Sequence, residues 1–317
     1  MFRRISLIWF SALALVCGCS SPSTIALLTD YGWDDPYAGA IQGVIVSINP
    51  EVRLLNLTHA VPAHDIREAS YLLVTAAKEF PEKTIFLAVV DPEVGGSRKA
   101  IIVETLDKKL FVGPDNGIFT DVIRTFGFKK AVAITNMLWF RKGDVSSTFH
   151  GRDVFAPAAA RLSTGKSMDD AGPMLQEKEL ELLQRTPAEL TEQGLITGEI
   201  LHCDHYGNLV TNIPASTLAK AGWRPGMALE FVVKYQVVTA KLAQKYSDVA
   251  KGEMVLVLNG QGLLELARYL GNAGESLQAM AGDSIVVRTV GSKEPVTNSS
   301  PAATATRLSN AVSSRDK

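Results

Sequence analysis

Four short segments of this 317-residue chain combine residue types that can do chemistry. In the first, TDYGWDDPY (29–37), Asp30 directly follows an apolar run, and its acceptor-only carboxylate suits a pair of ribose hydroxyls. Asp35, in the same segment, suits a ligand ammonium group. Taken alone, the segment reads equally well as a strand-to-helix turn with capping aspartates.

The second segment, DPEVGGSR (91–98), joins an acid and a proline to a pair of glycines, which is typical of a tight loop. Such a loop can bring Asp91 and Arg98 together, where the aspartate stays ionised and fixes the guanidinium. On its own, the pair is more simply a structural ion pair in a turn. The nearby segment VGPDNG (112–117) is typical of a turn, and we expect its role to be structural.

The third segment, SSTFHGRD (146–153), places His150 just before an alanine-rich stretch with helical spacing. A single histidine is more often a hydrogen-bonded structural residue than a catalyst. If His150 meets Asp91 and Arg98, however, the three side chains can hold and deprotonate a water molecule. This convergence is the central hypothesis that the sequence offers.

The fourth segment, DHYGNLVTN (204–212), reads as a hairpin turn around Gly207-Asn208. The Asn208 amide both donates and accepts hydrogen bonds, which matches the edge of an adenine. The spacing of His202, Cys203 and His205 is superficially metal-like, but such residues alternate between the faces of an extended strand. We therefore predict no metal site there, and no glycine-rich dinucleotide or triphosphate motif occurs in the sequence.

An alternating α/β chain must position the first three segments. Apolar, β-rich runs predict strands at 24–29, 52–57, 84–90, 99–105 and 131–135. Runs with helical spacing predict helices at 36–48, 65–80, 116–127 and 152–163. The alternation indicates an α/β N-terminal domain with a mostly parallel sheet, and such sheets bind ligands at the carboxyl ends of their strands.

Composition divides the rest of the chain. The α/β domain is expected to span residues 24–165, and the polar, charged stretch 166–195 is predicted to be a linker. Residues 196–290 carry short β segments between Gly, Asp and Asn turns, which is typical of a small all-β barrel. The Ser/Thr/Ala/Asn-rich residues 291–317 predict a disordered tail.

The charge balance narrows the class of partner. Lys and Arg number 32 against 33 Asp and Glu, so there is no basic field to hold nucleic acid, and small molecules are the expected partners. Hydrophobic residues make up 46% of the chain and charged residues 21%, which indicates a globular protein rather than a disordered or disulfide-stapled one.

The N-terminus suggests export. Residues 1–18 contain two arginines and an apolar run too short to span a bilayer comfortably, which predicts a signal peptide of the lipoprotein type. The segment from Val16 to Cys19 resembles a bacterial lipobox. We therefore expect lipidation of Cys19 and a lipoprotein anchored to a membrane, at the periplasmic face or the cell surface. Cys203 would then remain without a disulfide partner in its own chain.

Seven motifs in register resemble the S-adenosyl-L-methionine (SAM) hydroxide adenosyltransferases, the adenosine-forming SAM hydrolases related to the fluorinase and chlorinase. They run in family order from about residue 24 to residue 288. The motifs are TDYGWDDPYAG (29–39), THAVPAHDI (58–66), DPEVGGSRKAI (91–101), VGPDNGIF (112–119), TFHGRDVFAPAAA (148–160), DHYGNLVTNI (204–213) and NGQGLLELARYLGNA (259–273).

This resemblance implies a SAM-binding α/β domain, a C-terminal β-barrel, and a homotrimer with active sites between one subunit's first domain and a neighbour's second. The family's water-activating Asp, Arg and His fall on Asp91, Arg98 and His150, and its ribose-binding acid falls on Asp30. The remaining substrate contacts would come from Asp35, Tyr37 and Asp204 for methionine, and from Asn208 and the backbone near Asn272 and Ala273 for adenine.

The implied reaction is attack by water or hydroxide on the ribose C5′, which expels neutral methionine from the sulfonium and gives adenosine. SAM is the substrate, and no cofactor is implied. Two departures from the family pattern are Asn56, where Asp is usual, and Gly260, where Ser is usual and would contact methionine.

Two other functions stay open at this point. A halide-using adenosyltransferase would need a dry, donor-lined pocket, and the set of Asp91, Arg98 and His150 argues against one. An exported, non-catalytic nucleoside-binding lipoprotein is the alternative from another class.

Overall fold

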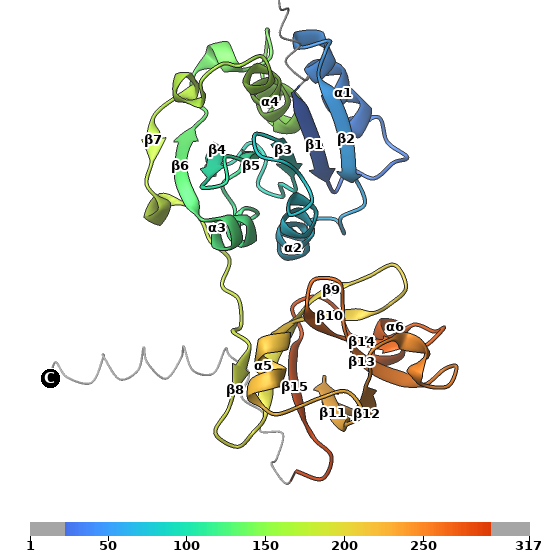
Figure 1. Ribbon diagram of the computed structural model, residues 1–317. Coiled ribbons are helices and arrows are strands. Elements are labelled where there is room, and N and C mark those ends of the chain that lie inside the picture. The colour runs from blue at the N-terminus through green and yellow to red at the C-terminus, as the bar shows by residue number, and fades with distance from the viewer. Residues whose placement is uncertain (1–22, 293–317) are drawn as a thin grey trace, which may run out of the picture.

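The computed structural model describes residues 23–292, which form two domains joined by an extended segment (Figure 1). The predicted signal peptide (1–18), the predicted lipidation site at Cys19 and residues 293–317 of the predicted tail lie outside the described residues. Among the residues described, no helix combines the length and the apolar character needed to cross a membrane.

A seven-stranded sheet forms the centre of the N-terminal domain, with the order β2-β1-β3-β5-β4-β6-β7. The strands are β1 (Thr24–Thr29), β2 (Arg53–Thr58), β3 (Ile85–Val89), β4 (Ala100–Thr105), β5 (Leu110–Pro114), β6 (Phe128–Ala133) and β7 (Met174–Leu175). The neighbours from β2 to β5 pair in parallel, whereas β4, β6 and β7 extend the sheet with antiparallel pairs. The predicted α/β domain with a largely parallel sheet is confirmed.

The antiparallel part of the sheet has a simple cause. Residues 99–105 were predicted as a strand and residues 112–117 as a turn, but 110–114 form the strand β5. Only residues 106–109 connect β4 to β5, and so short a connection cannot make the crossover that parallel strands need. The two strands therefore pair as a hairpin. Gly113 and Pro114, the residues that suggested a turn, end β5.

Helices cover both faces of this sheet, because successive side chains of the buried strands point to opposite sides. They are α1 (Tyr37–Ile48), α2 (Ile66–Ala77), α3 (Thr120–Phe126) and α4 (Ala156–Ser163). Ile25 and Leu27 of β1 pack in the same core cluster as residues of α1 and α4, and Ala26 and Leu28 pack with residues of α2 and α3.

Shorter turns complete the chain. The 3₁₀ turns are η1 (Met137–Trp139), η3 (Met168–Ala171), η4 (Glu177–Glu179) and η5 (Tyr246–Asp248), and η2 (Gly151–Phe155) is a π-helical turn that runs directly into α4. The predicted helix 152–163 is therefore a π turn followed by a regular helix. Such π turns are rare and often occur at functional sites.

The C-terminal domain is a seven-stranded barrel, which confirms the predicted all-β domain. Its strands are β9 (Ile196–Cys203), β10 (Leu209–Pro214), β11 (Ala228–Val233), β12 (Gln236–Leu242), β13 (Met254–Leu258), β14 (Leu263–Arg268) and β15 (Ser284–Thr289). The order β10-β14-β13-β12-β11-β15-β9 closes through pairing of β9 with β10. The short helices α5 (Ala215–Lys220) and α6 (Ala273–Leu277) follow β10 and β14.

The segment expected to be a linker contributes to both sheets. β7 pairs with β6 in the first domain, and the short strand β8 (Glu189–Leu190) pairs with β9 in the second. Lying between these two pairs, Arg185 contacts both Glu199 of β9 and Asp121 of α3. The polar residues of this segment are therefore used in specific contacts.

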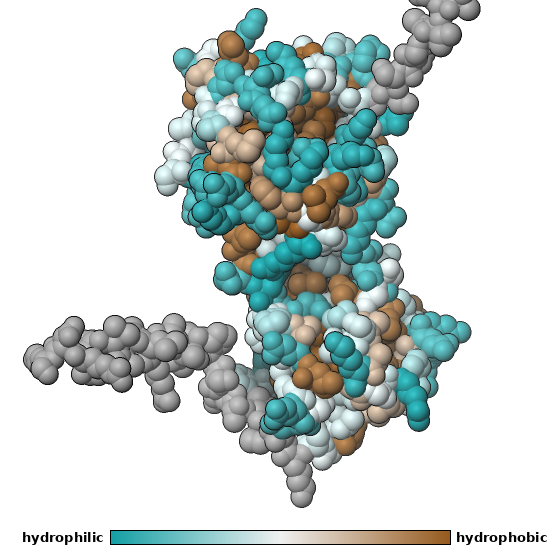
Figure 2. All heavy atoms as spheres, turned by 60° about the vertical axis from the view of Figure 1, so that its left-hand side comes forward, coloured by the Kyte–Doolittle hydropathy of each residue, from teal (hydrophilic) through white to brown (hydrophobic). Residues whose placement is uncertain are grey.

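Ion pairs join α2 directly to the barrel. Arg67 lies 2.9 Å from Glu199, whose side chain is 1% exposed, and His202 Nδ1 lies 2.8 Å from Glu68 Oε1. Figure 2 shows the two domains as separate masses that meet at a narrower waist, with hydrophilic side chains spread over both. These contacts fix the two domains at that waist.

Candidate active site

Two neighbouring parallel strands bring the first acidic residues together. Thr29 of β1 lies opposite Val89 of β3, and each strand is soon followed by an aspartate, Asp30 or Asp91. Because parallel neighbours end at the same edge of a sheet, both carboxylates line one cleft.

Arg98 connects Asp91 to His150. Its Nε lies 2.9 Å from Asp91 Oδ1, Nη2 contacts Asp91 Oδ2, and the same Nη2 lies 2.8 Å from His150 Nδ1. The Arg98 and Asp91 side chains are only 4% and 5% exposed, and the guanidinium lies over the Phe155 ring. The structure thus places the three predicted water-activating residues in one hydrogen-bonded group.

This contact fixes the protonation of His150. An arginine can only donate, so Nδ1 must be the acceptor, and the neutral ring carries its hydrogen on Nε2. Burial and the positive charge of Arg98 lower the pKa of His150, although Asp91 and Asp153 partly oppose them. At neutral pH the imidazole is therefore an uncharged ring with an N–H donor at Nε2.

A buried aspartate holds the loop that carries His150. The Asp153 carboxylate is fully buried, accepts two hydrogen bonds from Arg152 at 2.7 and 2.8 Å, and accepts another from the backbone N–H of Ser146 at 2.9 Å. Two glycines allow this loop to pack closely. A Cβ atom on Gly95 would overlap the carbonyl oxygen of Ser147, and one on Gly151 would overlap the Tyr31 hydroxyl.

The cleft in front of this group has a volume of about 480 Å³. Its lining includes Asp30, Tyr31, Asp35, Tyr37, Asp91, Phe149 and His150. Asp30 Oδ2 accepts the backbone N–H of His64 at 3.0 Å, whereas Oδ1 has no partner among the described residues. The structure therefore brings Asp30, Asp35 and Tyr37 into one cavity with the water-activating group.

A hydrogen-bonded chain holds the end of β1 behind the cleft. Thr29 Oγ1 lies 2.8 Å from Nδ1 of the buried His59, and His59 Nε2 lies 3.0 Å from Asn56 Oδ1. Gln42 Nε2 donates to the same Asn56 oxygen. Asn56, which departs from the family pattern, is therefore an acceptor for His59, and burial lowers the pKa of this histidine.

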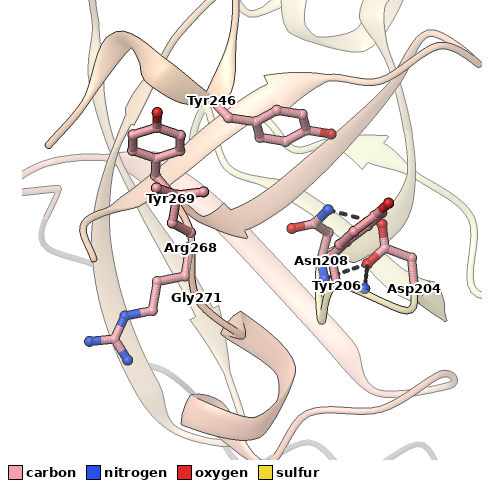
Figure 3. A pocket seen from close by; sticks show the side chains of 8 residues that line it. Asp204, Tyr206, Asn208, Tyr246, Arg268, Tyr269 and Gly271 are labelled. Carbon is pink, nitrogen blue, oxygen red and sulfur yellow. Dashed lines mark hydrogen bonds between the residues drawn. The ribbon is translucent and has the colours of Figure 1, made fainter. Parts of the chain in front are cut away.

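A second cavity, of about 500 Å³, lies on the barrel (Figure 3). Its lining comprises Asp204, Tyr206, Asn208, Tyr246, Arg268, Tyr269, Leu270 and Gly271. Asp204 Oδ1 accepts the backbone N–H groups of Tyr206 and Asn208 at 2.9 and 2.8 Å, and its Oδ2 accepts the Asn208 amide at 2.9 Å. The predicted turn is present, and it leaves the Asn208 amide oxygen without a partner among the described residues.

Asn272 and Ala273 lie beside this cavity but are not part of its lining. Asn272 caps α6 by accepting the backbone N–H of Glu275 at 2.7 Å, and the Ala273 N–H donates to the carbonyl oxygen of Gly207 at 3.1 Å. The Ala273 N–H thus helps to hold the turn around Gly207, whereas the Asn272 side chain holds the start of α6. The prediction that the backbone near Asn272 and Ala273 faces adenine stays a prediction, and the Ala273 N–H is already used within the chain.

Tyr246 was missed by sequence reasoning. Its hydroxyl donates to Glu265 Oε1 at 2.7 Å, Glu265 is 3% exposed, and burial raises the pKa of this carboxyl group. The buried acid therefore fixes the Tyr246 ring at the edge of the cavity. The only available sequence signal was an aromatic residue in a polar turn. Tyr31 and Phe149 were also missed, although each is adjacent in sequence to a predicted site residue.

The two cavities share no lining residue. Within one chain, the structure does not bring Asp204 and Asn208 to His150. Among the described residues, no group of three or more His, Cys, Asp or Glu side chains could hold a metal ion. His202 instead pairs with Glu68.

Comparison with known proteins adds independent information. The family model of the SAM hydroxide adenosyltransferase N-terminal domain matches residues 25–172, and that of the C-terminal domain matches residues 198–286. A solved structure of an uncharacterized conserved protein from Thermotoga maritima has a TM-score of 0.79 and 36% identity, over 83% of this chain and 99% of that one.

Curated relatives agree with this match. The (R)-S-adenosyl-L-methionine hydrolase of Salinispora tropica is 36% identical over 264 residues, which cover 83% of this chain and 97% of the relative. The hydrolase of the same name from Thermus thermophilus is 34% identical over 80% of this chain and 94% of the relative. A fluorinase from Actinoplanes is 24% identical over 83% of this chain and 96% of the relative.

The predicted localisation is wrong. The relatives that match 80–84% of this chain are named SAM hydrolases, and none of these names describes an exported or lipid-anchored protein. An apolar run behind two arginines is a local pattern that depends on few residues, whereas the match to these enzymes extends over both domains. The prediction of an exported lipoprotein lipidated at Cys19 is therefore withdrawn.

Proposed function

Because the chain belongs to the SAM hydroxide adenosyltransferase family, we propose that it hydrolyses SAM to adenosine and L-methionine. Oxygen of water forms a bond to the ribose C5′, and the C5′–S bond breaks with its electron pair going to sulfur. One proton is released to solvent. The observation that carries this proposal is the bridging position of Arg98, which contacts Asp91 and His150 at once.

The water-activating group works mainly by electrostatics. Sulfonium is a good leaving group, so the enzyme needs to align water behind C5′ and lower the cost of removing its proton. The Nε2–H of His150 donates to the water oxygen, and the Arg98 charge favours its hydroxide form. Asp91 keeps the guanidinium in place.

The same cleft suits the ribose and the methionine portion. Asp30 Oδ1, which has no protein partner among the described residues, accepts the ribose hydroxyls. The rings of Tyr31, Tyr37 and Phe149 meet edge to face, with centroids 5.4 to 6.1 Å apart, and aromatic rings attract a sulfonium cation. Asp35, in the same lining, accepts the substrate ammonium.

The barrel cavity suits the adenine. The free amide oxygen of Asn208 can accept from the adenine amino group, and the flat rings of Tyr206 and Tyr246 offer stacking surfaces. Asp204 contributes by holding Asn208. The family resemblance also assigns it a contact with the methionine portion.

A homotrimer completes the site in this proposal. The Asp30 and His150 cleft and the Asn208 cavity belong to different domains and share no lining residue. A substrate that needs both must bind where the first domain of one subunit faces the barrel of its neighbour, and a closed ring of such head-to-tail contacts has cyclic symmetry.

Halide transfer and idle nucleoside binding are not favoured. The SAM hydrolases match this chain at 29–36% identity, whereas the fluorinases match at 24–25%.

The direct test is incubation of the purified protein with SAM, followed by chromatography of adenosine and methionine. We expect both products in equal amounts from the wild type, and no turnover but retained adenosine binding from His150→Ala. Full activity in that variant would refute the role of His150. Chloride-dependent halogenated adenosine would indicate halide transfer, and adenosine binding without turnover in the wild type would indicate a binding protein.

A further inference from the structure

One polar group in the catalytic cleft has no task in the reaction described so far, namely the hydroxyl of Tyr31. Tyr31 lines the cleft, and its backbone N–H donates to Thr29 Oγ1 at 3.2 Å, but its hydroxyl has no hydrogen-bond partner among the described residues. The buried side-chain polar atoms without partners in residues 23–292 are Nε of Arg67 and of Arg185. The Tyr31 oxygen is therefore open to the cleft.

The position of this oxygen is close to the water-activating group. It lies directly against Gly151, since a Cβ atom there would overlap it, and Gly151 follows His150 in the chain. The charges that act on the phenol belong to Asp30, Asp91 and Arg98. The hydroxyl thus lies beside the loop of His150, in the cleft that Asp30 and Asp91 also line, where C5′ and the water must meet.

The ring around this oxygen is held without any hydrogen bond to the hydroxyl. Its centroid lies 6.1 Å from that of Tyr37 and 5.9 Å from that of Phe149, both in edge-to-face geometry. Burial, reinforced by Asp30 and Asp91, raises the pKa of Tyr31 far above its usual value, so the phenol stays protonated at every pH the enzyme meets. A fixed, neutral oxygen with free lone pairs is a suitable acceptor for a water hydrogen.

We propose that the Tyr31 hydroxyl is a further catalytic residue, which accepts one hydrogen of the attacking water while the Nε2–H of His150 donates to the water oxygen. This inference rests on the proposed hydrolysis of SAM. The two contacts orient the remaining lone pair of the water toward C5′. The hydrogen held by Tyr31 stays on the new 5′-hydroxyl of adenosine, and the other hydrogen of the water leaves to solvent as the proton released.

Tyr31→Phe tests this role, because it removes one oxygen and breaks no hydrogen bond within the described part of the chain. We expect kcat for SAM hydrolysis to fall about 10- to 100-fold, which is the scale of one lost contact to a buried polar group. KM for SAM, the Kd for adenosine and the thermal midpoint should stay close to the wild-type values. Tyr235→Phe makes the same chemical change at a 75% exposed residue and should leave kcat unchanged.

The other outcomes distinguish failure of the Tyr31 role from failure of the proposed SAM hydrolysis. Wild-type turnover with an equally fast Tyr31→Phe variant would overturn only the role of Tyr31. A weaker Kd for adenosine with unchanged kcat would also overturn it, because the hydroxyl would then be a ribose contact. If the wild-type protein makes no adenosine, the proposed function fails, and this inference fails with it.

Discussion

Arg98 Nη2 lies 2.8 Å from Nδ1 of His150, and this contact determines which nitrogen of the neutral imidazole carries the hydrogen. Because the guanidinium has hydrogens to donate and no lone pair to offer, the ring keeps its own hydrogen on Nε2. The histidine is thereby a donor toward the cleft. It can become a proton acceptor at Nδ1 only by giving up its contact with Arg98.

Arg98→Lys tests the need for this geometry. A lysine keeps the charge but cannot bind Asp91 with two nitrogens and reach His150 as well. We expect kcat to fall about 100-fold or more, measured by adenosine release. Arg224→Lys, at an exposed position, is the matched control and should not change kcat. Equal loss in both variants would contradict the geometric argument.

The acid limb of the pH profile should report on His150. Burial and Arg98 lower the pKa of His150 below its usual value of about 6.5. The neutral form, with its hydrogen on Nε2, is therefore the major form at neutral pH. We expect kcat/KM to be constant near neutrality and to fall as the pH drops through this lowered pKa, because protonation places a hydrogen on Nδ1 and breaks its contact with Arg98. The limb should be missing from the residual activity of His150→Gln. An acid limb centred above pH 7 in the wild type would argue against this assignment.

Tyr246 and Glu265 offer a conservative pair of variants. Tyr246→Phe leaves the buried Glu265 carboxyl without its 2.7 Å partner, and we expect a loss of about 1–3 kcal/mol in unfolding free energy together with weaker adenosine binding. Glu265→Gln keeps an oxygen acceptor for the phenol and should bind adenosine nearly as the wild type does. Calorimetry and thermal unfolding measure the two effects. The idea fails if Glu265→Gln is the more damaging change.

The close packing at Gly95 should be intolerant of a methyl group. A Cβ there would overlap the Ser147 carbonyl oxygen, and the φ of Gly95 is +79°, so we expect Gly95→Ala to lower the unfolding free energy by about 1–3 kcal/mol and to reduce kcat. Gly43→Ala is the control, since nothing lies within 4 Å of a Cβ in the middle of α1. It should stabilise the protein by about 0.5–1 kcal/mol. Similar unfolding curves for the two variants would contradict the packing argument.

Mixing two inactive variants tests whether sites are shared between subunits. His150→Ala damages only the N-terminal cleft, and Asn208→Ala combined with Asp204→Ala damages only the barrel cavity. Co-refolded in equal amounts, the two should recover activity, because about a quarter of randomly formed interfaces would join two intact halves. No recovery, in mixtures that do form hetero-oligomers, would place the whole site within one chain.

The main features of the fold follow from hydrophobic patterns in the sequence. β1 and β3 were predicted because their residues are apolar on both faces, as strands between two helix layers must be. β5 was missed because its last residues, Gly113 and Pro114, are typical of turns. Pro114 is tolerated at the end of the strand, where a missing backbone donor costs little.

In the site, contacts within one loop could be predicted from the sequence, whereas contacts between distant segments could not. Asp91 and Arg98 lie in one loop, so their ion pair was predictable from spacing. Their contact with His150 depends on the packing of a loop more than fifty positions later, which only glycines at 95 and 151 allow. The roles of Tyr31 and Tyr246 could not be predicted, because a tyrosine in a polar segment has no recognisable spacing signal.

The ion pairs at the waist have a consequence for quaternary architecture. Arg67 and Arg185 converge on the buried Glu199, so each polypeptide holds its cleft and its barrel cavity at a set angle before any association occurs. The proposed homotrimer closes as a ring only if that angle matches the rotation between adjacent copies. If the proposed homotrimer forms, replacement of Glu199 would therefore change the angle between the domains and hinder closure of the ring.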